Sequence, residues 1–115
     1  MKAGDIVLTA VPQADGQVKN RPALLLCQLP PFADLLVCGV STQLRHEVAG
    51  FDETVTRQDD DFSASGLVAD SLIRLGFLAV IPQSQVIGSI GSIAAERHTR
   101  LLQNLSNHLL QSAQL

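Results

Sequence analysis

Hydrophobic residues occur along the chain in short runs that turn-forming residues separate. Apolar side chains dominate residues 5 to 11, 21 to 28 and 34 to 40, and proline follows the first two runs. Runs of this length and composition predict strands, and the nearly continuous apolar stretch Ala23–Cys27 predicts a central strand covered on both faces. We expect the second and third runs to pair as antiparallel neighbours. Residues 13 to 20 contain an Asp-Gly pair and predict an exposed loop.

The middle of the chain is polar and less regular. In residues 43 to 65 only Phe51 and Val55 indicate a short strand, and Ser65-Gly66 at the end predicts a turn. Strand composition returns from Asp70 to Ile81, where Gly76 predicts a bend or a bulge. Near the C-terminus the spacing of the apolar residues changes from that of a strand to that of a helix.

Four leucines near the C-terminus recur with helical spacing: Leu101, Leu102, Leu105 and Leu109. They predict a helix from an N-cap at Ser92 to about Gln111, with one apolar stripe to pack against the sheet. Five or six short strands with turns between them predict a small barrel or a strongly curved sheet.

Composition and length bound the type of protein. The chain has 115 residues, of which 46% are apolar and 17% charged, so we expect one folded domain over residues 1–115 and no disordered tail. The longest apolar runs are far shorter than the roughly 18 to 20 residues that cross a bilayer. Asp5 interrupts the apolar stretch that a secretory signal would need. We therefore expect a cytoplasmic protein without a membrane segment.

The charged residues and cysteines narrow the possible chemistry. Eight basic and eleven acidic residues give a net charge of −3, which argues against a protein that coats nucleic acid by bulk electrostatics. Any nucleic-acid site must be local. Cys27 and Cys38 lie in apolar runs without a partner at metal-ligand spacing, so we interpret them as buried free thiols and expect no metal site.

Several short motifs follow one another in a characteristic order. They are Gly4-Asp5-Ile6-Val7, Arg21-Pro22-Ala23-Leu24, Val40-Ser41-Thr42-Gln43, Ser65-Gly66-Leu67 with Ser71-Leu72-Ile73-Arg74, and Ile87-Gly88-Ser89-Ile90. In order and approximate spacing they resemble the PemK/MazF family of toxin ribonucleases, from residue 4 to about residue 105. Each motif alone is weakly specific, and their joint order carries the resemblance.

The resemblance implies a fold, an activity and a set of partners. The fold is mainly β with a C-terminal α-helix, a small SH3-like barrel of the PemK/MazF/CcdB type. The activity is cleavage of single-stranded RNA, chiefly mRNA, by a homodimer that uses neither metal nor cofactor. The protein partner is a cognate antitoxin that occupies the RNA groove.

The resemblance also assigns candidate catalytic residues. Arg21 matches the catalytic arginine of the family, and Arg74 matches a second one; a guanidinium offers a fixed fork of donors to two phosphate oxygens. Ser41 stands where the family has a threonine, and Thr42 follows it. As strand neighbours these two point to opposite faces, so we expect only one hydroxyl to act. Alternatively, Arg21 pairs with Asp15, and both hydroxyls belong to ordinary strand-end residues.

The proton carrier is the main departure from the family. Members with an Arg-x-Asp sequence have a carboxylate where this chain has Gly76. His46 is another possible carrier because its ordinary pKa suits the role, although a solvated loop histidine is the simpler interpretation. We expect RNA contacts from Lys19, Gln43, Arg45 and His46. The alternative function is a CcdB-like or degenerate family member that binds gyrase or the antitoxin without cleaving RNA.

The aromatic and acidic side chains predict which residues stack on RNA bases and which stay in solvent. RNA readers stack unpaired bases on aromatic rings. Because the chain has no Trp or Tyr, Phe51 and Phe62 are the loop candidates for that role. Asp59-Asp60-Asp61 predicts a solvated turn on the outer rim of a groove. His98 and His108 lie on the predicted helix, where we expect surface residues.

Overall fold

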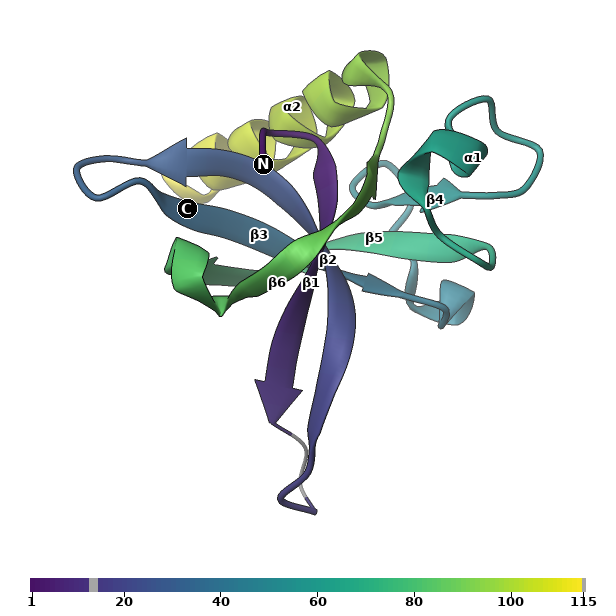
Figure 1. The fold of residues 1–115 in the computed structure, drawn as a ribbon. Coiled ribbons are helices and arrows are strands. Elements are labelled where there is room, and N and C mark those ends of the chain that lie inside the picture. Colours follow the sequence, from purple (N-terminus) through teal and green to yellow (C-terminus); the bar gives the residue numbers. More distant parts are fainter. Residues whose placement is uncertain (13–14, 115) are drawn as a thin grey trace.

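A computed structural model describes residues 1–12 and 15–114 of the chain, without the side chains of Val11 and Pro12. Within these residues, strands precede a long C-terminal helix (Figure 1). The strands are β1 Asp5–Pro12, β2 Val18–Leu29, β3 Asp34–Ser41, β4 Glu53–Val55, β5 Ser71–Ile81 and β6 Val86–Ser92. The α-helices are α1 Phe62–Ser65 and α2 Ala95–Ser112, and the 3₁₀ turns are η1 Leu44–His46 and η2 Gln83–Gln85.

The strands form one antiparallel sheet in the order β4-β5-β3-β2-β1-β6. The mainly β fold with a C-terminal helix is therefore confirmed, as is the antiparallel pairing of β2 with β3. The sheet is strongly curved, and the β1–β2 hairpin projects from it (Figure 1). The predicted loop is shorter than expected, because Val18 to Asn20 already pair with β1. Gln13 and Ala14 of that loop lie outside the described residues.

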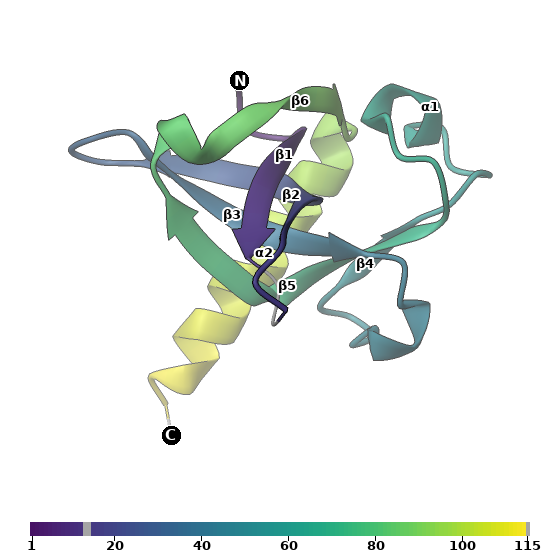
Figure 2. The ribbon, with the colours of Figure 1, turned by 60° about the horizontal axis from the view of Figure 1, so that its bottom comes forward.

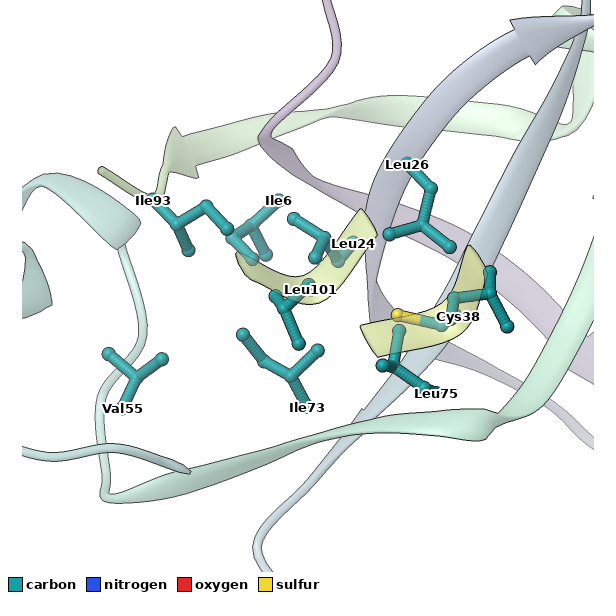
Figure 3. Packing of buried hydrophobic residues seen from close by; sticks show 10 residues of the cluster. Ile6, Leu24, Leu26, Cys38, Val55, Ile73, Leu75, Ile93 and Leu101 are labelled. Carbon is teal, nitrogen blue, oxygen red and sulfur yellow. The ribbon is translucent and has the colours of Figure 1, made fainter. Parts of the chain in front are cut away.

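Strand β2 is buried on both faces, as the unbroken apolar run predicts. Leu24 and Leu26 belong to the main core, which lies between the sheet and α2 (Figure 3). Ala23 and Leu25 face the other way, into a smaller apolar cluster with residues of β1 and β3. The alternation of a strand therefore divides its side chains between two cores.

Helix α2 covers the main core with its first three turns, up to Leu105. Leu101 and Leu105 are buried there, and Leu102 is half-buried. The predicted stripe is wrong at Leu109, which is 60% exposed because the C-terminal end of the helix extends beyond the sheet (Figure 2). Neither this helix nor any other among the described residues is long and apolar enough to cross a membrane.

The start of α2 differs from the prediction. Ser92 is the last residue of β6 and not an N-cap; the helix begins at Ala95. The cap residue, Ala94, has no side chain that could satisfy a free N–H group. The carboxylate of Asp61 supplies the acceptor instead, taking a hydrogen bond from the Ala94 N–H at 3.0 Å. A residue distant in sequence thus fixes the start of a helix whose N-cap has no side-chain acceptor of its own.

The acidic run is not the solvated turn that its composition predicts. Asp61 is 8% exposed and accepts from Nε and Nη2 of Arg97 at 2.8 and 3.0 Å. The same guanidinium contacts Glu53 at 3.0 Å and Asp59 at 3.3 Å, and only Asp60 stays exposed. The bidentate pair holds α2 against the segment before α1. The hydrogen bonds from Arg97 lower the pKa of Asp61 despite its burial.

Two further features, α1 and the position of His98, differ from the sequence-based predictions. Residues 62–65 form α1, a helical turn that no periodicity marks, and Gly66 ends it in the left-handed conformation with φ 74°. A Cβ on Gly66 would lie 2.0 Å from the Ile90 carbonyl oxygen, so no larger residue fits without a shift. His98 is half-buried and not a surface residue. Its Nε2 lies 2.8 Å from the Leu26 carbonyl oxygen, at an irregularity in the pairing of β2 with β3.

The Arg97 contacts predict a large difference between two arginines of α2. Both Arg97 and Arg100 bind Glu53, but their side chains are 10% and 53% exposed. Replacing Arg97 by leucine leaves the buried Asp61 without its cation and should lower the free energy of unfolding by about 3–5 kcal/mol. The control Arg100→Leu should cost about 0–1 kcal/mol. Urea unfolding followed by circular dichroism measures both, and equal costs would contradict this account.

The lowered pKa of Asp61 predicts acid sensitivity. A carboxylate whose pKa is lower in the folded than in the unfolded state stabilises the fold at pH values above its ordinary pKa of 3.8. That contribution is lost as the pH falls through the folded-state pKa. Below about pH 4 the parent should therefore lose stability more steeply than Asp61→Asn. Urea unfolding at a series of pH values checks this, with the exposed Asp60→Asn as a control that should follow the parent.

Candidate functional site

A groove of about 690 Å³ opens on the face of the sheet opposite α2. Its floor includes Ala23, Val37 and Ile81, which belong to the smaller apolar cluster or pack against it. The polar residues along its walls come from four strands and the segments that follow them. They are Thr9, Arg21, Ser41, Thr42, Gln43, Ser71, Arg74 and Gln85.

Strand alternation brings residues of β1, β2 and β3 to this face. Thr9 and Arg21 are cross-strand partners, and the Thr9 hydroxyl donates to the Arg21 carbonyl at 3.5 Å. Arg21 lies two positions before Ala23, and Ser41 lies four positions after Val37, so both share the face of the smaller cluster. The arginine side chain is exposed and free to reach into the groove.

Strand β5 reaches the groove through an interruption in its pairing with β3. Gly39 pairs with Arg74, whereas the preceding Cys38 pairs with Leu78. The three residues between Arg74 and Leu78 have no register partner, and the predicted irregularity at Gly76 lies among them. In a regular strand Arg74 and Phe77 would face opposite sides. The interruption changes the phase, so that both line the groove.

A buried carboxylate supports this irregular stretch. Asp52 is 7% exposed, and its Oδ1 accepts a hydrogen bond from the Leu75 N–H at 3.0 Å. Its other oxygen accepts from the Val48 N–H at 2.9 Å. Asp52 therefore ties the segment before β4 to β5, next to Arg74. Burial, with a smaller contribution from this carboxylate, raises the pKa of Cys38 to about 12. The thiol is thus protonated and no nucleophile.

Ser41 and Thr42, the two hydroxyl-bearing residues at the end of β3, are both among the residues that line the groove. Ser41 is the last strand residue, so the alternation of β3 does not extend to Thr42, and the expectation that only one of the two hydroxyls acts stays a prediction. The Ser41 Oγ accepts a hydrogen bond from the Gln43 N–H at 3.0 Å, which restrains its position. Thr42 is exposed.

The groove differs from the rest of the molecule in charge. None of the eleven acidic residues is among the described residues that line it, whereas Arg21 and Arg74 both are. Among the described residues Arg21 forms no ion pair, and Asp15 accepts from the Gln17 N–H instead. A protein of net charge −3 thus presents a cationic hollow lined with hydroxyl groups, which suits a polyanion.

Three residues that the sequence associates with RNA do not line the hollow. Lys19 lies on β2 in the projecting hairpin, and Arg45 and His46 lie in η1; all three are exposed. Gln43 does line it, and its side-chain oxygen accepts a hydrogen bond from Arg45. The structure therefore separates the predicted residues into a group in the groove and a group on elements beside it.

The aromatic candidates are corrected by the structure. Phe51 and Phe62 are half-buried and pack against the main core, so neither is an open stacking surface. Phe77, which sequence reasoning did not select, is 62% exposed in the groove. The only signal for it was its position directly after Gly76, and only the changed phase of β5 shows which way it faces.

Comparison with known proteins agrees with this architecture. Residues 2–109 match the family described as PemK-like, MazF-like toxin of type II toxin-antitoxin system. Among solved structures the chain is similar to the Mycobacterium tuberculosis toxin MazF-mt6, with a TM-score of 0.64 and 22% identity. That likeness covers 90% of this chain and 93% of the toxin. No curated protein matches the sequence. Because the family match extends over nearly the whole chain, the protein belongs to the PemK-like, MazF-like toxins of type II toxin-antitoxin systems.

Proposed function

We propose that this toxin is a metal-independent endoribonuclease that cleaves single-stranded RNA, chiefly mRNA, in the groove opposite α2. The observation that carries the proposal is the grouping of Arg21, Arg74 and the hydroxyls of Ser41 and Thr42 in a hollow without acidic side chains among its described lining. An acidic protein gains such a surface only if its carboxylates are placed elsewhere. A phosphodiester is the ligand that this arrangement favours.

The proposed reaction uses the 2′-hydroxyl of the substrate as nucleophile. Its oxygen attacks the adjacent phosphorus, the bond to the 5′-oxygen breaks, and the products are a 2′,3′-cyclic phosphate and a 5′-hydroxyl. The 2′-hydroxyl loses its proton and the leaving oxygen gains one. Negative charge increases on the phosphoryl oxygens in the transition state, and preorganised donors stabilise it there.

The residues of the groove have distinct proposed roles. Arg21 and Arg74 bind the phosphoryl oxygens and stabilise the transition state. The hydroxyl of Ser41 or Thr42 donates to the same phosphate. Gln43 contacts the RNA beside this phosphate. We retain Lys19, Arg45 and His46 as proposed contacts with more distant RNA, because they lie on elements that adjoin the groove: Lys19 is two residues before Arg21, and η1 directly follows Gln43.

The described lining of the groove contains no evident group for proton transfer. Position 76 is a glycine, and among the described lining residues there is no carboxylate and no imidazole. His46, the predicted alternative carrier, is exposed in η1 outside that lining. We therefore expect catalysis to depend mainly on charge stabilisation by the two arginines, with a correspondingly low rate.

The toxin has an antitoxin partner by the nature of its family, and we propose that this partner covers the groove. We further propose that the toxin acts as a cytoplasmic homodimer. Leu78 and Val80 support the dimer: they are 42% and 55% exposed on β5, beyond the short stretch that β4 covers. Exposed apolar side chains on an unpaired strand edge favour association with another chain.

A second candidate function is binding to a protein target, such as gyrase or the antitoxin, without RNA cleavage. Two observations favour it: the missing carboxylate at Gly76, and the exposed leucines at the end of α2. Leu109 and Leu110 are 60% and 67% exposed where the helix extends beyond the sheet. A toxin of this kind would depend on its helix end and not on Arg21.

Cleavage of a long single-stranded RNA in the presence of EDTA tests the leading proposal. The parent should release fragments with 2′,3′-cyclic phosphate and 5′-hydroxyl ends. Arg21→Ala removes a guanidinium from the transition state and should lower the rate about 100- to 1000-fold. The exposed arginine Arg57 lies outside the described lining of the groove, so Arg57→Ala is the matched control and should keep the parental rate.

Failure of a well-folded parent to cleave any RNA would contradict the proposal and support the protein-binding function. In that case, replacing the exposed Leu109 and Leu110 by serine should abolish toxicity in cells, whereas Arg21→Ala should remain as toxic as the parent. Sedimentation of the same samples gives the mass of the toxin in solution and tests the dimer separately.

The two hydroxyls should differ in importance. Ser41 Oγ is restrained by its hydrogen bond from the Gln43 N–H, whereas Thr42 is exposed. A restrained group contributes more to transition-state binding, so Ser41→Ala should lower the single-turnover rate by about 10- to 100-fold and Thr42→Ala by less than about 3-fold. Ser41→Thr, which keeps a hydroxyl, should restore most of the rate. The reverse order of effects would assign the role to Thr42.

A further inference from the structure

The ring of Phe77 is an exposed aromatic surface in a cationic groove. It is 62% exposed and lines the hollow together with Arg74 and Arg21. The other exposed phenylalanine, Phe32, is 81% exposed but does not line the groove. Leaving a large apolar ring in water is unfavourable, so its position beside two cations points to a ligand.

The backbone under the ring is shaped to receive it. A Cβ at Gly39 would lie 2.8 Å from Cδ1 of Phe77, closer than nonbonded carbon atoms approach. The glycine thus allows the ring to rest on β3. On the same ring, the Cζ of Arg74 lies 5.9 Å from the centroid, within the range of a cation–π contact. Strand β3 and the guanidinium therefore both restrain the ring, which keeps most of its surface exposed.

The chemistry of the surroundings identifies the occupant. An arginine beside an exposed aromatic ring is the combination that proteins use for single-stranded nucleic acid, since the cation binds the phosphate and the ring stacks on the base. A second copy of the chain would have to remove water from Arg74 and the neighbouring hydroxyls, which costs free energy. The absence of acidic groups from the described lining favours the polyanion.

We propose that Phe77 is the base-stacking residue of this groove, which holds the unpaired base next to the phosphate that Arg74 binds. The inference rests on the proposed function, because it assumes that RNA occupies the groove. It adds a specific contact: a ring that binds any base through its face. Phe77 therefore contributes affinity for single strands over duplexes, in which the base faces are already stacked.

Binding of a non-cleavable probe tests this contact separately from catalysis. The probe is a single-stranded RNA of about 12 nucleotides of mixed sequence, methylated at every 2′-oxygen so that the nucleophile is blocked. Phe77→Leu should weaken binding about 5- to 100-fold, and Phe32→Leu should leave it unchanged. An abasic strand of the same length should bind the parent and Phe77→Leu equally, because it offers phosphates without bases.

Two more variants test the position of the ring. The chain contains no tryptophan, so Phe77→Trp introduces a single fluorophore at the proposed stacking site. Its emission should be quenched by the probe and unaffected by the abasic strand. Gly39→Ala should displace the ring and weaken binding to a similar degree. Combined with Phe77→Leu it should cause no further loss, because both changes remove the same contact.

Different results would overturn different parts of the argument. If Phe77→Leu binds the probe like the parent while Arg21→Ala binds it weakly, the stacking role is wrong and the ribonuclease proposal stands. If the folded parent does not bind the probe at all, both are wrong. If Phe77→Leu instead lowers the mass in sedimentation, and the tryptophan responds to protein concentration but not to the probe, the ring lies between two copies of the chain, which also overturns the stacking role.

Discussion

The interrupted pairing between β3 and β5 is the constraint on which the groove depends. Three residues of β5 lie outside the register, and the alternation of side chains changes phase across them. Leu75 therefore stays in the main core, while Arg74 before it and Phe77 after it both face the groove. Two other features maintain this geometry. Asp52 accepts the hydrogen bond of the Leu75 N–H, and Gly39 leaves space for the ring. In a regular strand, either Arg74 or Phe77 would face the main core and not the groove.

The second feature of the molecule is a division of charge between the two faces of the sheet. Asp61 and Glu53 are bound by Arg97 at the start of α2, and Asp52 accepts hydrogen bonds from the backbone. These carboxylates stabilise the packing of α2 and the segment before β4, away from the groove. The guanidiniums of Arg21 and Arg74 are then the charged groups of the groove's described lining. Net charge alone is therefore a poor guide to the partner of this protein, because the charged residues of the groove's described lining have the opposite sign.

Much of the fold was predictable because it depends on local patterns. The unbroken apolar run of β2 predicted a strand buried on both faces, and Gly76 predicted an irregularity where β5 loses its register. The errors at Ser92 and Asp61 share one cause: a contact with a residue distant in sequence overrides the local pattern. Ser92 is a residue type that often caps helices, but the strand pairing of β6 extends through it, and Asp61 binds the N–H of the actual cap residue, Ala94. Asp61 itself appears in an acidic run that predicts solvent exposure, and only the position of Arg97 on a distant helix makes it a buried ion-pair partner.

The sequence by itself determined most of the strands, the C-terminal helix, the family, and the residues that carry the proposed chemistry. Arg21, Ser41, Thr42 and Arg74 stand in motifs that can be read along the chain. Only the tertiary structure decided which of the polar residues share one groove. It brought Gln43 and Phe77 to that groove, left Lys19, Arg45 and His46 on adjoining elements, and packed Phe51 and Phe62 against the core. The physical reason is that the direction of a side chain on a strand depends on the register with its neighbours, and register is a property of pairs of strands.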